Sequence, residues 1–141
     1  MLKRIIAGSA IALVPFGAFA KWMQTAFKAD NYSSALSAIG VDSPTLSDKI
    51  KLKAPEIAEN GAVVPIQVSS TLENIETISL LVEKNPTPLT AQFKMFPGLK
   101  ADFKIRVRMG ETSKVIAVVQ AGGKSYSAES EVKVTIGGCG G

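Results

Sequence analysis

Cys139 is the only cysteine of this 141-residue chain, and the chain contains no histidine. A thiol forms reversible covalent bonds with other sulfur atoms, so one cysteine can hold a cargo, link two chains or act as a nucleophile. The absence of histidine removes the usual general base, the Ser-His-Asp and Cys-His mechanisms and His-ligated metal sites. A single cysteine also excludes an internal disulfide and a cysteine-cluster metal site. We therefore expect one reactive thiol and no catalytic, metal-binding or cofactor-binding residues.

Glycines flank this cysteine on both sides, at Gly137, Gly138, Gly140 and Gly141. Because glycine makes up about 7% of an average sequence, four such neighbours arise by chance roughly once in 10⁴ to 10⁵ cases. Glycines make a chain thin and flexible, which suits an arm that enters a narrow enzyme channel. Five residues beyond Ile136 reach at most about 16–18 Å. The pattern predicts a flexible arm over residues 137–141 that carries a cargo on Cys139.

Other roles for Cys139 stay open at this point. Most lone cysteines are small buried hydrophobic residues, but no packing residues surround this one. An intermolecular disulfide would make the protein a structural or interaction module cross-linked through Cys139. A thiol enzyme is the weakest alternative, because no activating base lies beside the cysteine in sequence. A carrier needs no such base, since its partner enzymes supply the catalysis.

The N-terminus has the features of a secretory signal peptide over residues 1–20. Lys3 and Arg4 are followed by a nearly continuous apolar run, and Ala18-Phe19-Ala20 has the form of a cleavage site. The alternative is an uncleaved anchor, but the run is shorter than the roughly 20 residues that span a membrane. We expect a periplasmic protein that begins at Lys21 and has no membrane segment after cleavage.

The elements that must position the arm are predicted to be mainly strands. Residues 21–48 read as a helical segment, best defined over Tyr32–Ile39, with Asp30 or Asn31 at its start and Gly40 at its end. From Lys49 onward, apolar residues recur at every second position, which is the spacing of a β-strand. Seven strands are expected, over 50–52, 63–68, 75–83, 89–96, 103–109, 115–120 and 126–136, with Pro65 indicating an edge or a bulge. Strands at this spacing favour an immunoglobulin-like antiparallel β-sandwich over residues 49–136.

Charge argues against nucleic acid as a partner. The formal net charge is +4, and removal of Lys3 and Arg4 with the signal leaves 14 basic and 12 acidic residues, a balance of only +2. Lys104, Arg106 and Arg108 share one face of a strand. That face is either ordinary solvated surface or a place that attracts anionic partners or an anionic cargo.

Several segments together resemble a known family, the sulfur-carrier Y subunit of the Sox thiosulfate-oxidation system (SoxY). The segments are the Gly137-Gly138-Cys139-Gly140-Gly141 motif, the preceding residues 131–136, and residues 54–65 and 106–113. The resemblance covers essentially the whole chain after the signal. One departure is the Lys3-Arg4 pair, because many family members carry a twin-arginine signal.

The resemblance implies a covalent sulfur carrier rather than an enzyme. Cys139 would be conjugated with thiosulfate by a haem-containing partner, which gives a cysteine S-thiosulfonate. A hydrolase would then release sulfate and leave a persulfide, and in some organisms a sulfur dehydrogenase oxidises the remaining sulfur. The carrier would form a heterodimer with a second β-sandwich, the Z subunit. No cofactor is implied beyond the sulfur bound to Cys139.

Overall fold

The computed structural model describes residues 24–135. The predicted signal peptide at 1–20 and the predicted arm at 137–141 lie outside the described residues. Residues 24–28 are helical and are followed by helix α2, Tyr32–Ala38. Within the described part, no helix is both long enough and apolar enough to cross a membrane.

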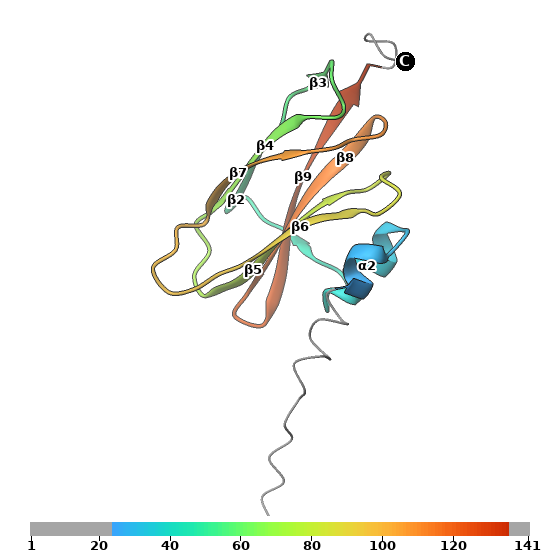
Figure 1. Cartoon of the computed structure of the whole chain (residues 1–141). Coiled ribbons are helices and arrows are strands. Elements are labelled where there is room, and N and C mark those ends of the chain that lie inside the picture. The colour runs from blue at the N-terminus through green and yellow to red at the C-terminus, as the bar shows by residue number, and fades with distance from the viewer. Residues whose placement is uncertain (1–23, 136–141) are drawn as a thin grey trace, which may run out of the picture.

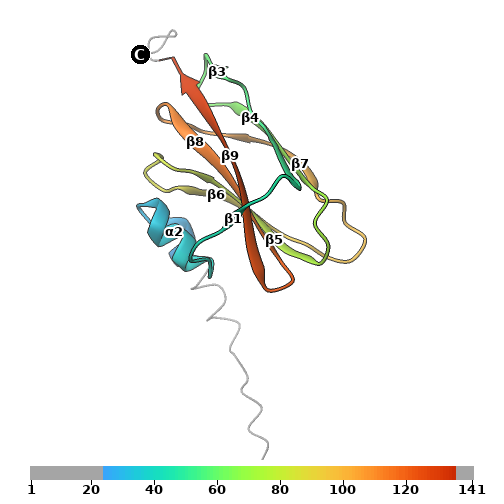
Figure 2. The same cartoon turned by 180° about the vertical axis from the view of Figure 1, so that it is seen from behind.

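Strands dominate the described residues and form two sheets that face each other (Figures 1 and 2). The larger sheet has the order β1-β9-β8-β5-β6, with β3 also paired to β9; its strands are Thr45–Leu46 (β1), Ile57–Ala58 (β3), Ile75–Val82 (β5), Leu89–Lys94 (β6), Ser113–Ala121 (β8) and Lys124–Val134 (β9). The smaller sheet has the order β2-β4-β7; its strands are Ile50–Lys53 (β2), Val64–Ser70 (β4) and Asp102–Val107 (β7). The predicted fold, a mainly β, immunoglobulin-like sandwich after a short helical segment, is confirmed.

The core lies between the two sheets and follows the alternation of the strands. Along β4 the side chains of Val64, Ile66 and Val68 are buried, whereas the residues between them face outward. They pack with buried side chains of the larger sheet, such as Ile78 and Leu80. Each fully buried aliphatic side chain of this size stabilises the fold by about 1.5–3 kcal/mol relative to an exposed one. A face that is apolar on every second residue must cover a second sheet, which is why these strands form two layers.

Aromatic stacking joins the two sheets between their outermost strands β6 and β7. The rings of Phe93 on β6 and Phe103 on β7 stack with centroids 4.4 Å apart and an interplanar angle of 9°. Such pairs contribute about 0.5–1.5 kcal/mol beyond the area they bury. This contact fixes one side of the small sheet against the larger one.

Helix α2 covers part of the outer face of the larger sheet. The Asn31 side chain caps it by accepting a hydrogen bond from the Ser34 N–H at 2.8 Å. Leu36 packs in a second core cluster that includes Leu81 and Ile116 of the sheet. The helix therefore buries the outward side chains of β5 and β8, and these two strands are apolar on both faces for that reason.

Two strands, β1 and β3, are not among the seven predicted strands. Both pair in parallel with β9: Thr45 lies opposite Tyr126, and Ile57 lies opposite Lys133. Each has only two residues, which is too short to show an alternating pattern in the sequence. Between them the chain leaves the larger sheet, forms β2 at the edge of the smaller sheet, and then returns. The long ladders are antiparallel as predicted, and these two short pairs are the exceptions.

The prediction that Pro65 marks an edge strand or a bulge is wrong for β4 as a whole, because β4 is the central strand of the smaller sheet and its register with β7 has no shift. The local environment of Pro65 explains the signal. Pro65 lies opposite Arg106 on β7, but β2 pairs only with Gln67 to Ser70 of β4. At Pro65 the strand therefore has a neighbour on one side only, which is the condition under which proline is tolerated in a sheet.

Candidate functional site

The residues predicted to carry the chemistry lie outside the described part of the chain. These are Cys139 and the four arm glycines, Gly137, Gly138, Gly140 and Gly141. The structure does describe the strand that precedes these residues, β9, up to Val134 and the residue after it, Thr135. The geometry around these two residues, called the arm root from here on, determines where the fixed part of the chain ends.

Strand β3 binds the end of β9 from one side. The Lys133 N–H donates to the Glu56 carbonyl at 2.9 Å, and the Thr135 N–H donates to the Ala58 carbonyl at 3.2 Å. Ala58 also lies opposite Val134 in the parallel register and is buried. Figure 1 shows β3 beside the end of β9, at the end of the sandwich where β4 begins. The backbone is thus paired up to the last described residue.

The Thr112 hydroxyl fixes the arm root from another side. Its oxygen accepts a hydrogen bond from the Val134 N–H at 3.0 Å and lies 3.5 Å from the Val134 carbonyl oxygen, to which it donates. Thr112 lies directly before β8, the strand that pairs with β9 on that side. A threonine in this place satisfies two backbone groups that the end of the β8–β9 ladder would otherwise leave without a partner.

Gly61 permits a third close contact at the arm root. A Cβ at this position would lie 2.5 Å from the Met109 carbonyl oxygen and 2.9 Å from Val134 Cγ1. The Met109 N–H donates to the Gly61 carbonyl at 2.6 Å. The segment between β3 and β4 therefore lies against both Val134 and the segment after β7, an approach that only glycine allows. A lone glycine between two strands is common, so the sequence does not indicate that Gly61 permits this close approach to Met109 and Val134.

The surface beside the arm root carries exposed apolar side chains. Ile57 is 58% exposed and Val63 is 48% exposed. Ile57 lies on β3 opposite Lys133 of β9, and Val63 lies two residues after Gly61, which approaches Val134. Exposed aliphatic side chains are common on surfaces that contact other proteins.

Basic residues collect on the outer face of the smaller sheet. Lys104 and Arg106, which sequence reasoning placed on one strand face, are exposed on β7. Arg108 lies beyond the end of β7 and is also exposed, and its carbonyl accepts a hydrogen bond from Asn85 Nδ2 at 2.6 Å. The fold adds Lys53 from β2 to the first two, because all three line one hollow. No sequence pattern indicates that addition, since Lys53 is far from β7 along the chain.

Residues 24–135 contain no group of three or more His, Cys, Asp or Glu side chains placed to hold a metal ion.

The family comparison decides the identity of this sandwich. Residues 36–139 match the model of a family described as sulfur oxidation protein SoxY, and Cys139 is the last residue of the match. The chain belongs to the SoxY family. Membership assigns it to sulfur oxidation.

A solved SoxY structure gives the same result. The sulfur carrier protein SoxY from Chlorobium limicola f thiosulfatophilum is 41% identical to this chain, with a TM-score of 0.68; the match covers 80% of this chain and 99% of that one. A chain from a study of T cell activation by the bacterial superantigen toxic shock syndrome toxin-1 is 14% identical, with a TM-score of 0.43; that match covers 61% of this chain and 99% of the other, and it is too distant to inform function. Among curated proteins, none matches this sequence.

Proposed function

We propose that this SoxY protein carries sulfur intermediates covalently on Cys139 and presents them to partner enzymes, without catalysing a reaction itself. Two findings support the proposal. The family match extends through Cys139, and the 41% identical relative is a sulfur carrier protein. The absence of histidine from the whole sequence also argues against a thiol enzyme, since a cysteine nucleophile usually needs a neighbouring base.

The observation that carries the proposal is that hydrogen bonds hold the last described residues of β9, while the sequence continues from there into glycines around Cys139. The backbone of β9 is held through Thr135 by β3 and Thr112. Cys139 follows four residues later, between pairs of glycines. Four residues span at most about 13–14 Å, so the thiol can be presented well away from the sandwich while its origin stays fixed. A fixed root and a thin glycine segment suit delivery into a buried active site.

The proposed chemistry on Cys139 has two steps in its simplest form. In the first, the thiol and thiosulfate form a new S–S bond, giving a cysteine S-thiosulfonate and releasing one proton and two electrons to a haem-containing partner. In the second, a hydrolase adds water across the S–SO₃⁻ bond, so that sulfate leaves and a persulfide stays on Cys139. A sulfur dehydrogenase is a further partner that would oxidise this sulfur.

The proposed setting is the periplasm, after removal of the signal peptide at residues 1–20. There the chain would pair with a Z-type subunit as a heterodimer. Exposed Ile57 and Val63 beside the arm root support a surface that contacts proteins. An enzyme that takes the thiol into its active site must approach this end of the sandwich, because the reach of the arm is short.

Intact-protein mass spectrometry tests the proposal. The chain is purified from its host during growth on thiosulfate and measured before and after reductant, with a Cys139→Ser chain as the control. We expect reductant-sensitive masses for a thiosulfonate and for added sulfur atoms, mapped to Cys139 and absent from the serine chain. If no sulfur adduct is found during turnover, the proposal is wrong. A protein–protein disulfide in its place would show that Cys139 serves as a cross-link.

A further inference from the structure

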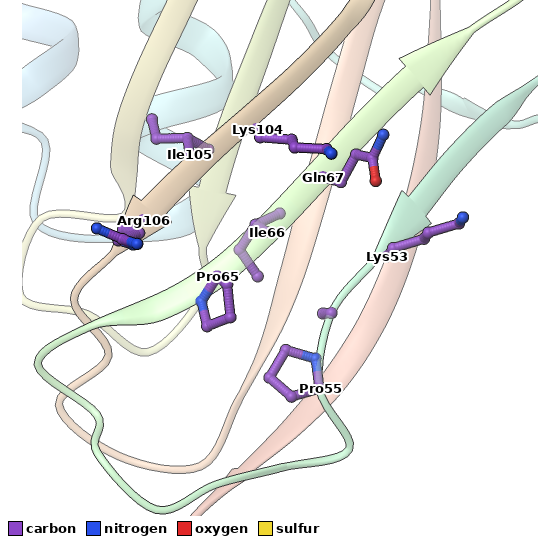
Figure 3. A pocket seen from close by; sticks show the side chains of 9 residues that line it. Lys53, Pro55, Pro65, Ile66, Gln67, Lys104, Ile105 and Arg106 are labelled. Carbon is purple, nitrogen blue, oxygen red and sulfur yellow. The ribbon is translucent and has the colours of Figure 1, made fainter.

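A hollow of about 830 Å³ lies on the outer face of the smaller sheet. Figure 3 shows Pro55 and Pro65 at one end of it, with Lys53 on β2 to one side and Lys104 and Arg106 on β7 to the other. Nothing in the described part of the chain covers this face. The hollow therefore combines an apolar end with a basic border.

The strand register places the three basic residues on either side of Gln67 and Pro65 of β4. Lys53 lies opposite Gln67 on β4, and Gln67 lies opposite Lys104 on β7. The two lysines are thus two strand spacings apart, about 10 Å between Cα atoms. Figure 3 shows the Lys104 side chain directed toward Gln67 and the Lys53 side chain directed away from it, so Lys53 must rotate to contact a group above Gln67. Arg106 joins from the next outward position of β7, opposite Pro65.

These three cations have no acidic partner in the described part of the chain, where the one ion pair is Lys114 with Glu129. The carboxylate on this face of β7 is Asp102, whose Oδ1 accepts a hydrogen bond from Gln67 Nε2 at 2.8 Å. The hollow retains a positive excess after Asp102 is counted. A concave basic surface of this kind concentrates anions.

The end of the hollow that Pro55 lines is joined to the arm root by backbone hydrogen bonds of neighbouring residues. Pro55 precedes Glu56, whose carbonyl binds the Lys133 N–H, and Arg106 lies three residues before Met109, which binds Gly61 beside Val134. Cys139 follows Val134 by five residues and can lie up to about 16–18 Å from it. Pro55 and Val134 are the chain neighbours of Glu56 and Lys133, which a 2.9 Å hydrogen bond joins, so the Pro55 end of the hollow lies within this reach.

We propose that this hollow holds the anionic end of the sulfur adduct on Cys139 when residues 137–141 lie back against the domain. The inference rests on the proposed carrier function and adds a resting site for the loaded thiol. The sulfonate oxygens of a cysteine S-thiosulfonate accept charge-assisted hydrogen bonds from Lys53, Lys104 and Arg106. In that position the S–S bond lies against Pro55 and Pro65, and thiols in solution reach it more slowly.

NMR spectroscopy of the isotope-labelled mature chain tests the proposal directly. Tetrathionate converts the Cys139 thiolate to the S-thiosulfonate and releases thiosulfate, and methyl methanethiosulfonate gives a neutral methylthio adduct for comparison. We expect the backbone amide signals of Gln67, Lys104 and Arg106 to shift with the anionic adduct only, and to return toward their free positions at high salt. No shift at these amides, or the same shift with both adducts, overturns the proposal.

A matched pair of variants gives a second readout. In K53Q/K104Q/R106Q the thiosulfonate is expected to be released by a neutral thiol roughly two- to tenfold faster than from the unmodified chain, as loss of three exposed charge contacts predicts. The control K94Q/K100Q/K124Q removes the same charge from exposed lysines outside the hollow and is expected to leave the rate unchanged. Equal rates in all three chains count against the resting site.

The outcomes separate this inference from the proposed function. If cells load Cys139 with sulfur but the chemically loaded chain shows no shift, only the resting site is wrong. If cells never load Cys139, the carrier function fails whatever the spectra show. If the variant loses turnover with partner enzymes while the loaded chain alone shows no shift, the hollow binds an acidic surface of a partner and the arm does not occupy it.

Discussion

The Thr112 hydroxyl binds both backbone groups of Val134, accepting from its N–H at 3.0 Å and donating to its carbonyl at 3.5 Å. Val134 is the last residue of β9, and Thr135 forms one more backbone hydrogen bond, to Ala58. A side chain directly before β8 therefore contributes to fixing the point from which the chain continues to Cys139. Such a point must stay in place if the thiol is to be delivered at a defined distance from the sandwich.

Replacement of Thr112 by valine is expected to loosen the arm root. Valine has nearly the same shape but lacks the hydroxyl, so both hydrogen bonds are lost at a cost of about 0.5–1.5 kcal/mol each at most. Hydrogen exchange of the Val134 and Thr135 amides measures the effect and should become faster in T112V. The matched control T112S keeps the hydroxyl and is expected to exchange like the original chain. Equal protection in T112V and T112S would show that Thr112 does not hold the root.

Replacement of Gly61 by alanine is expected to destabilise the fold by about 1–3 kcal/mol, as overpacking of a close contact does. The new methyl group would meet the Met109 carbonyl oxygen at 2.5 Å and Val134 Cγ1 at 2.9 Å. Gly110 provides a control in the neighbouring loop, because a Cβ there meets nothing within 4 Å. Urea unfolding measures both variants. A stability of G61A equal to that of G110A would mean that the loop moves aside without cost.

The sandwich could be predicted from the sequence because its signal is repeated in every long strand. Along β7, Phe103 and Ile105 point inward while Lys104 and Arg106 point outward, so the period alone indicates which face is buried. The pairing of Thr45 with Tyr126 and of Ile57 with Lys133 could not be predicted in this way. Those contacts join residues more than 70 positions apart through two-residue strands, and only the folded topology brings them together.

The candidate site also contains residues that the sequence indicates and residues that only the folded structure brings together. Cys139 could be proposed as the carrier residue from the sequence because residue type and composition around it are unusual, with no geometry needed. The residues that fix the arm root, such as Thr112 and Gly61, are ordinary in sequence and acquire their role from three-dimensional contacts. The sequence predicts that Lys104 and Arg106 share a strand face but predicts no hollow, because Lys53 joins them only through the β2–β4–β7 register.

Tyr32, at the start of helix α2, is expected to make stability fall at alkaline pH. Burial raises its pKa above the ordinary value of 10.0, and the charges of Glu129 and Glu83 raise it further. From about pH 10 the unfolded chain releases this proton before the folded chain does, so unfolding is increasingly favoured as pH rises through the folded pKa; below pH 10 the contribution is fully present. Thermal unfolding of Y32F from pH 8 to pH 11 should show a shallower alkaline decline than that of the original chain.

The two glutamates provide a graded comparison for Tyr32. In E83Q/E129Q the electrostatic causes are removed while burial, the larger cause, remains. The alkaline decline of this variant is expected to lie between those of the original chain and Y32F. Parallel curves for all three chains would show that Tyr32 ionisation does not contribute to alkaline unfolding.

The glycines around Cys139 are expected to matter for turnover and not for folding. In G138V/G140V two branched side chains would widen the arm beside the thiol and restrict its backbone, so that Cys139 no longer fits a narrow enzyme channel. We expect thiosulfate-dependent sulfur turnover with partner enzymes to fall by about 10²-fold, the size of effect that a misplaced reacting group has. The free energy of unfolding should change by no more than about 0.5 kcal/mol, because both positions lie beyond the anchored root.

The alanine pair G138A/G140A adds less bulk and should lose less turnover. Tetrathionate should load Cys139 equally in all three chains, because that reagent needs no channel. Full turnover in G138V/G140V would mean that partners reach Cys139 without threading the arm, and the glycines would then need another explanation.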